Sequence, residues 1–307
     1  MLSYIFKRLL VAIPTLLILI VASAILMHAA PGGPFTGERK LPDEVIANLN
    51  AKYGLDQPLW KQVLIYLKGV IFHFDFGVSF KYKDRTVNDI LAQSFPVTLV
   101  YGFWSFVVAT ALGVLSGVIA AIRQNSWADY LVLSLAIAGA VLPGFVLAPV
   151  LVLVFTLKLG WLPGGGWEDG QWQYLVMPVI ALSTAYIASI ARITRSSMLE
   201  VLTSNHIRTA RAKGLPEWKV ITRHALKPAM LPVMSYLGPA FVGMITGSVV
   251  VDQYFSTGGI GKAFVDSALN RDYAVMLGIT ILVGALTILF NLLVDILYAW
   301  IDPKIRY

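Results

Sequence analysis

The stretch most suggestive of chemistry is the glycine-rich run Gly258–Ala263, GGIGKA. A phosphate-binding loop uses such glycines to bring backbone N–H groups close to phosphates, and its lysine reaches the terminal phosphates. Two positions disagree with that motif. Ser256 stands where its first glycine should be, and Ala263 replaces its metal-binding hydroxyl residue. We therefore expect that this chain neither binds nor hydrolyses ATP.

Other reactive groups are scarce in the long apolar runs of the chain. Transport driven by an ion gradient usually places ionisable side chains at mid-membrane, and these runs contain almost none. Asp295, near the end of the last run, is better explained as a packing or interfacial carboxylate than as a proton carrier. The runs hold no paired aspartates, HExxH motif or Ser/His arrangement. We expect no catalytic residue in this chain.

Metal chemistry is also disfavoured by the sequence. Nickel or another transition metal would favour clustered histidines or carboxylates, and the four histidines do not group. They are His28, His73, His206 and His224. We expect no metal site and no cofactor bound by this chain, so the energy for any transport must come from outside it.

The natural entry point for that energy is the segment Thr203–Pro228, which we call the elbow. Eight Lys and Arg lie between Arg192 and Lys227, against two acids. Ser204 or Asn205 can cap a short helix, and Gly214 suits a left-handed C-terminal cap. Pro216 suits the first turn of a second helix. The pattern predicts a helix, a sharp turn and another helix.

The short helix of the elbow has two chemically different sides. Arg208, Arg211 and Lys213 make one side basic, while Ile207 and Ala210 offer a small apolar contact. Ala210 and Ala212 allow close approach of a partner helix. A cytoplasmic loop that only obeys the positive-inside rule would explain the charge, but not the cap, glycine and proline pattern. We therefore predict a protein-docking elbow.

The elements around the elbow are apolar and long. Of 307 residues, 57% are hydrophobic and 13% charged, whereas soluble domains carry about 25% charged residues. Runs of about 20 apolar residues suffice to cross a bilayer. We expect an all-α integral membrane protein with six spans. These spans are Leu9–Ala30, Pro96–Ile122, Leu131–Leu157, Tyr174–Ala191, Ala229–Val251 and Ala274–Ile301.

The spans divide the chain into a helix at 1–30, an extracytoplasmic segment at 31–95 of mixed structure, and a core at 96–307. The first run also has features of a signal peptide, but its length favours a retained helix. In the outer segment we expect amphipathic helices from Pro42 to Asn50 and from Trp60 to Phe72. Within the spans, Gly113 and Gly117 favour close helix packing, and Pro143-Gly144 and Gly238-Pro239 favour kinks.

Charge in the short connections predicts the orientation. Lys7 and Arg8 precede the first span, the elbow is strongly basic, and Lys304 and Arg306 follow the last span. Both termini and the elbow should therefore face the cytoplasm. The net charge of +7 has the same explanation, so we expect no nucleic acid partner.

The elbow sequence Arg208–Leu215, RTARAKGL, followed by Arg223–Pro228, RHALKP, resembles the EAA loop of ABC importer permeases. More narrowly, it is similar to the branch that imports peptides and nickel. Arg208 stands at the glutamate position of the wider family, and Thr209 at its first alanine. Outside the elbow, the chain is similar to B-type permeases of oligopeptide importers. The segments that carry this likeness are Phe35–Arg39, Tyr53–Pro58, Phe74–Phe80, Phe80–Asp84, Trp161–Trp167 and Ile301–Tyr307.

This resemblance implies a type I ABC importer permease in a bacterial cytoplasmic membrane. Its partners would be a homologous C-type permease, two ATPases that use ATP and Mg²⁺, an extracytoplasmic peptide-binding protein and an oligopeptide substrate. The elbow would supply the coupling helix that docks on an ATPase. The residues of that helix would be Asn205, Ile207, Arg208, Thr209, Ala210, Arg211, Ala212, Lys213, Gly214 and Leu215. Alternatives are a permease for dipeptides, murein peptides or nickel, or a scaffold or channel that transports nothing.

Overall fold

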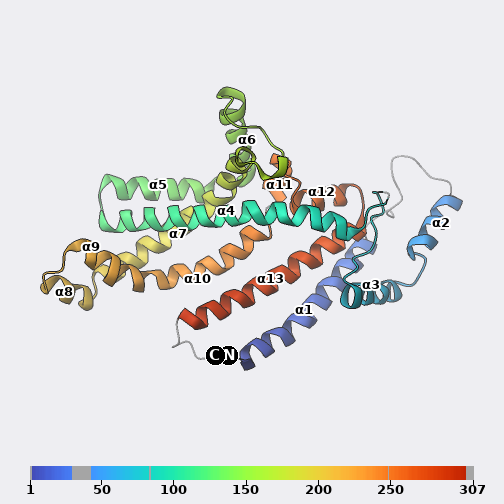
Figure 1. Cartoon of the computed structure of the whole chain (residues 1–307), viewed down its shortest axis with the longest axis horizontal. Coiled ribbons are helices and arrows are strands. Elements are labelled where there is room, and N and C mark those ends of the chain that lie inside the picture. Colours follow the sequence, from blue (N-terminus) through green and yellow to red (C-terminus); the bar gives the residue numbers. More distant parts are fainter. Residues whose placement is uncertain (1, 30–42, 83, 248, 302–307) are drawn as a thin grey trace.

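The computed structural model describes residues 2–29, 43–82, 84–247 and 249–301. Within these ranges the regular elements are helices, and an isolated antiparallel bridge joins Val78 to Thr86. Figure 1 shows long helices running along one axis, with α8 and α9 at one end and α2 and α3 at the other. Phe35–Arg39, Asp302–Tyr307 and the side chain of Asp295 lie outside the described part of the chain.

The helices follow one another along the chain with short connections. In order they are α1 Leu2–Ala29, α2 Asp43–Tyr53, α3 Leu59–His73, α4 Val87–Ile122, α5 Trp127–Val141, α6 Gly144–Leu151, η1 Val152–Lys158, η2 Glu168–Gly170, α7 Trp172–Leu202, α8 Asn205–Ala212, α9 Glu217–Lys219, η3 Val220–Ala225, α10 Leu226–Ile245, α11 Val249–Phe255, α12 Ile260–Leu269 and α13 Tyr273–Ile301.

Among the residues that the structure describes, four helices are long and apolar enough to cross a membrane by length and composition. They are α4, α7, the continuous helix Glu217–Ile245 and α13 over Tyr273–Val294. Together α5 and Gly144–Lys158 are also apolar and long enough, but they bend by 105° at the break between them, as a broken span or a re-entrant loop does. The 28-residue α1 adds a further apolar helix. The all-α membrane fold is confirmed, and the total of six spans stays a prediction.

The second span begins earlier than the sequence suggested, at Val87 rather than Pro96. Thr86 and Asp89 form a capping box, in which each side chain accepts a hydrogen bond from the backbone N–H of the other. This cap starts α4 inside the segment that we expected to lie outside the core. Pro96 is therefore within the helix.

The third span is broken where a kink was expected. Leu142 leaves the helical region, with φ −69° and ψ 113°, because the residue before a proline is pushed towards extended backbone. Pro143 then precedes a new helix, α6, which continues into η1. Figure 1 shows α6 leaving the direction of α5 and projecting from the bundle. The other expected kink, at Gly238-Pro239, does not interrupt α10.

Two further boundaries differ from the expectation. The fourth span was expected to end at Ala191, but α7 continues to Leu202. The fifth was expected to reach Val251, but α10 ends at Ile245 and α11 is a separate helix. Gly247, with φ +84°, lies in the turn between α10 and α11. The helices therefore extend further on the elbow side than hydropathy alone indicated.

The core is built around α4 and α7, which pack closely along their lengths. A Cβ added at Gly117 would lie 2.6 Å from the carbonyl oxygen of Ala191, so only glycine allows this approach. Buried side chains of α4, α7 and α10 form the central cluster, including Tyr101, Ile190 and Val233. The predicted close packing at Gly113 and Gly117 is confirmed.

The outer segment is tied to the start of α13. The Ser79 hydroxyl donates a hydrogen bond to the buried carboxylate of Asp272, and the Phe80 N–H donates to the same carboxylate over 3.1 Å. The two expected outer helices are present as α2 and α3. In Figure 1 α1 begins and α13 ends on the side towards α8, opposite α2 and α3.

Candidate functional site: the elbow

The first helix of the elbow, α8, spans Asn205–Ala212 and follows directly on α7. Ser204 occupies the N-cap position with extended backbone, and its carbonyl accepts the N–H of Arg208. Its hydroxyl does not cap the helix, because it donates to the Val201 carbonyl over 2.6 Å instead. The predicted start of the helix is therefore confirmed, whereas the predicted side-chain cap is wrong.

The turn after α8 has the predicted backbone. Gly214 adopts φ +73°, the left-handed conformation that glycine tolerates. Pro216 lies immediately before α9 rather than in its first turn. Arg211 and Glu217 pair across the turn, with Nε–Oε1 and Nη2–Oε2 distances of 2.7 Å and 3.3 Å. The bidentate pair links the two arms of the elbow.

The apolar side of α8 faces the interior of the chain itself. Ile207 and Ala210 are 0% and 5% exposed. They belong to one buried cluster with Met198 of α7 and Val220 of η3. The expectation that Ile207 and Ala210 offer an apolar contact to a partner is therefore corrected: these side chains anchor α8 to the bundle.

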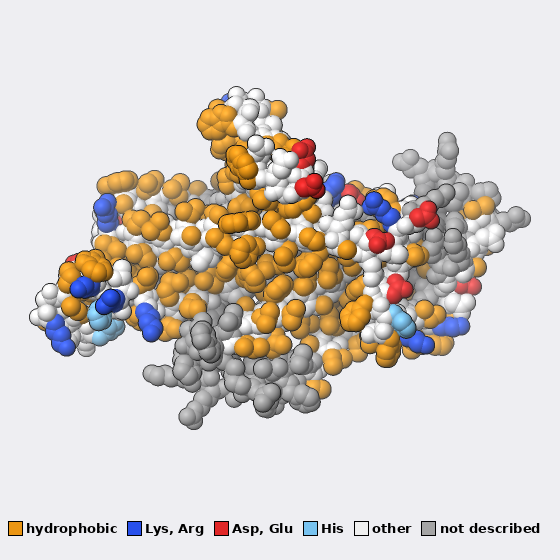
Figure 2. All heavy atoms as spheres, viewed as in Figure 1, with side chains coloured by type: hydrophobic (Ala, Val, Ile, Leu, Met, Phe, Trp, Pro, Cys, Tyr) orange, Lys and Arg blue, Asp and Glu red, His pale blue; other side chains and the backbone are white. Residues whose placement is uncertain are grey.

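The outward side of α8 is basic and small. The exposed residues of α8 are Asn205, His206, Arg208, Thr209, Arg211 and Ala212, and Lys213 directly after the helix is exposed too. Arg208 and Lys213 form no ion pair with any residue that the structure describes. Figure 2 shows Lys, Arg and His side chains gathered at this end of the molecule. The arrangement offers cationic donors around the exposed Ala212 to an acidic or polar partner surface.

Behind the elbow, an ion pair joins α7 to α5. Arg195 of α7 donates to Asp129 of α5 through Nε and Nη2, over 2.6 Å and 2.8 Å. The Asp129 carboxylate also accepts the Asn125 N–H, and it is 1% exposed. The start of α5 and the elbow end of α7 are therefore held together by a buried, charge-assisted contact.

Sequence reasoning missed Arg192 and Arg195 as residues of a spanning helix. The expected span stopped at Ala191, where hydropathy falls, although α7 runs on to Leu202. A signal was available, because no glycine or proline occurs between Ala191 and Thr203 and about half of the residues there are the good helix formers Arg, Met, Leu and Glu. The apolar run ends at Ala191, but the helix continues, because a helix does not need apolar residues to remain continuous.

The glycine-rich run of the sequence serves the fold. The Gly261 N–H donates to the carboxylate of Asp252 over 2.8 Å, and the Thr257 hydroxyl donates to the same carboxylate. The Ile260 N–H donates to Thr98 of α4 over 2.8 Å. The chain's own oxygens thus occupy the donors that a phosphate would need, which explains the glycines without nucleotide binding.

Family comparisons agree with this architecture. Residues 113–307 match the family described as binding-protein-dependent transport system inner membrane component, and residues 1–102 match the N-terminal family of the same transport systems. The chain is similar to a protein of Haemophilus influenzae named oligopeptide transport system permease protein OppB, at 58% identity over 100% of both chains. It is 61% identical to the protein of the same name from Escherichia coli, again over 100% of both.

A more distant relative is the dipeptide transport system permease protein DppB of Bacillus subtilis, 42% identical over 100% of this chain and 98% of that protein. Among solved structures, the inward-facing MetNI methionine ABC transporter has a TM-score of 0.60 at 16% identity, covering 70% of this chain and 97% of that one. At that identity the likeness concerns the fold, which is that of a type I ABC importer permease. The chain belongs to the family of binding-protein-dependent transport system inner membrane components.

Proposed function

We propose that this chain is the permease subunit of an ATP-driven importer and forms half of the pore that carries oligopeptides into the cytoplasm. The observation that carries the proposal is the 58–61% identity, over the full length of the chain, to relatives named oligopeptide permeases. A bacterial cytoplasmic membrane is its expected location, with both termini inside, because the basic residues gather beside the ends of the spans on one side.

The importer has three further kinds of component in this proposal. A homologous C-type permease completes the pore, two ABC ATPases bind ATP and Mg²⁺, and an extracytoplasmic binding protein delivers the oligopeptide. This chain itself binds no cofactor. The glycine-rich run supports this division, because its Ile260 and Gly261 N–H groups already donate to Thr98 and Asp252 and so are not available to a phosphate.

Coupling to the ATPase takes place on the exposed side of α8. When the ATPases close on ATP, the contact displaces α8 through Arg208, Thr209 and Ala212, which are exposed. Ile207 and Ala210 transmit the displacement, because they are buried in one cluster with side chains of α7 and η3. Since η3 continues directly into α10, the movement reaches two spanning helices together.

Reconstitution tests the proposal. The complete importer, assembled in proteoliposomes with candidate ATPases, C-type permease and binding protein, should hydrolyse ATP faster when loaded binding protein is present. It should also accumulate peptides of several residues. A scaffold or channel would give neither stimulation of the ATPase nor ATP-dependent accumulation, and that result would overturn the proposal.

A dipeptide permease is the second candidate, because the Bacillus subtilis relative carries that name at 42% identity. Uptake of peptides that differ only in length, from two to five residues, separates the two candidates. A nickel permease has less support. In the described part of the chain no three His, Asp or Glu residues lie close enough to hold a metal ion.

A further inference from the structure

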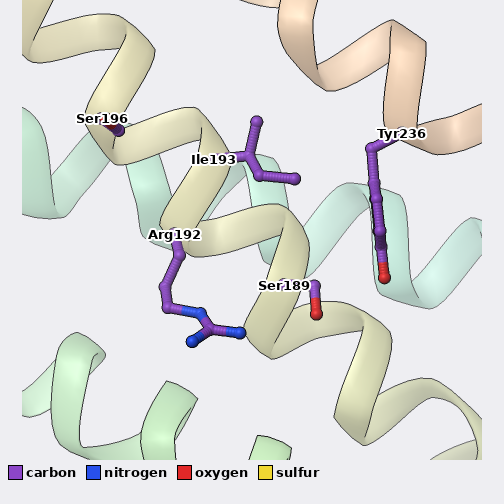
Figure 3. A pocket seen from close by; sticks show the side chains of 5 residues that line it. All are labelled: Ser189, Arg192, Ile193, Ser196 and Tyr236. Carbon is purple, nitrogen blue, oxygen red and sulfur yellow. The ribbon is translucent and has the colours of Figure 1, made fainter.

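A shallow, open pocket, here called the cavity, lies between α7 and α10, apart from the exposed side of α8. Its volume is about 480 Å³, and its lining residues are Ser189, Arg192, Ile193, Ser196 and Tyr236. Figure 3 shows Ser189 and Arg192 projecting from neighbouring turns of α7, while the Tyr236 ring extends from α10. The cavity therefore combines one cation with three hydroxyl groups.

The cation in this cavity has no counter-charge within the described chain. Arg192 forms no ion pair or hydrogen bond with the residues that the structure describes, whereas Arg195, about one helical turn away, is held by Asp129. No carboxylate lines the cavity. Arg192 is exposed and directly follows the apolar run that ends at Ala191, so it faces water or a partner rather than hydrocarbon.

The exposed side of α7 differs from the sides of helices that suit lipid. Along α4 the exposed residues include Phe103, Trp104 and Leu115, which are large and apolar. Along α7 they include Ala185, Arg192 and Ser196, which are small or polar. Contact with hydrocarbon favours the first kind of surface, and a wet pathway favours the second. The composition of this side of α7 therefore suits a wet surface better than a lipid-facing one.

Guanidinium groups bind carboxylates through two parallel hydrogen bonds, and neighbouring hydroxyl groups can complete the site. Each linear peptide that the proposed importer carries has one C-terminal carboxylate, whatever its side chains are. We propose that Arg192, with the Tyr236 hydroxyl lining the same cavity, binds the C-terminal carboxylate of the peptide on its way through the pore. The Ser189 hydroxyl already donates to the Ala185 carbonyl and so contributes no hydrogen bond to the carboxylate. This inference rests on the proposed function and adds a binding step within the permease.

The test uses the complete importer in proteoliposomes, with a tetraalanine peptide and its C-terminal amide as the two probes. Uptake of each probe is divided by its measured occupancy of the binding protein, so that delivery does not bias the comparison. Arg192→Ala should lower uptake of the free-acid peptide about tenfold relative to that of the amide, since one charge-assisted contact is lost. Arg192→Lys keeps the charge and should recover part of that loss.

Arg123→Ala is the matched control, because it removes an exposed cation from the turn after α4, outside the cavity. It should change the acid-to-amide ratio by less than about twofold. An equal fall for both peptides in Arg192→Ala would overturn the inference, since it would assign Arg192 to folding or to a contact with a partner subunit. Unchanged uptake of both peptides would also overturn it. Failure of the unaltered importer to carry either peptide would instead refute the proposed function.

A second measurement tests the wet surface without peptide transport. The chain has no cysteine, so Ser196→Cys and Leu115→Cys can be labelled singly. A membrane-impermeant thiol reagent should react with Ser196→Cys in the assembled importer and not with Leu115→Cys, which is on the lipid-facing side of α4. Labelling of Leu115→Cys alone would contradict the assignment of the two surfaces.

Discussion

Arg195 and Asp129 join α7 to the start of α5 by two hydrogen bonds, of 2.6 Å and 2.8 Å, just behind the elbow. Arg195 is 20% exposed and Asp129 is 1% exposed, so the carboxylate is almost completely enclosed. The contact fixes the elbow end of α7 against the start of α5. Displacement of α8 should therefore move these helices as a unit and leave their mutual packing unchanged.

Loss of this pair should destabilise the chain. We expect Asp129→Ala to lower the free energy of unfolding by about 2–3 kcal/mol, because it leaves a largely buried guanidinium without a partner. Thermal unfolding in detergent measures the effect. Asp266→Ala is the control, since its pair with Lys262 is 3.5 Å long with both side chains about one-third exposed, and it should cost about 0.5 kcal/mol or less. If both variants lost the same free energy of unfolding, the claim that the Arg195–Asp129 contact is enclosed would be refuted.

The anchor of α8 can be tested by graded truncation of Ile207. This side chain is fully buried, so Ile207→Val should cost about 1 kcal/mol and Ile207→Ala about 3 kcal/mol. Binding-protein-stimulated ATP hydrolysis should fall in the same order, because α8 loses its fixed position on α7 and η3. If Ile207→Ala is as stable and as well coupled as the unaltered chain, the anchor assignment is wrong.

Gly214 tests the shape of the turn. Its φ of +73° is unfavourable for other residues, and an added Cβ would meet no atom within 4 Å, so the effect is one of backbone strain alone. We expect Gly214→Ala to cost about 1–2 kcal/mol, with a larger cost for Gly214→Val. Peptide uptake per ATP hydrolysed should fall while membrane insertion is kept.

Gly144→Ala is the matched control for this turn. It also has free space around the added methyl group, but its φ is not positive. It should leave uptake per ATP unchanged within about twofold. Normal uptake in Gly214→Val, or the same loss in Gly144→Ala, would show that the conformation of Gly214 does not matter for coupling.

Local signals in the sequence were sufficient to predict the elbow. Gly214 and Pro216 act on their own backbone, so their effect does not depend on distant residues. The break at Pro143 was located for the same reason. Its size, 105°, was not predictable, because it depends on how α6 packs after the proline.

Features that depend on tertiary packing were less accessible. Ile207 and Ala210 form an apolar side of α8 in any structure, but the sequence does not say whether the chain itself or a partner covers that side. The end of α7 was missed because hydropathy indicates only which residues suit lipid, whereas helix propensity indicates which residues keep the backbone helical. Arg192 and Arg195 lie in the part of α7 that is helical but no longer apolar.

The central claim is that the outward side of α8, and not its apolar side, contacts the ATPase. Single-cysteine variants Thr209→Cys, Ala212→Cys and Ile207→Cys of this cysteine-free chain can be cross-linked to the ATPase in the assembled importer. Thr209→Cys and Ala212→Cys should cross-link, and the buried Ile207→Cys should not. Cross-linking of Ile207→Cys alone, or of none of the three, would contradict the account.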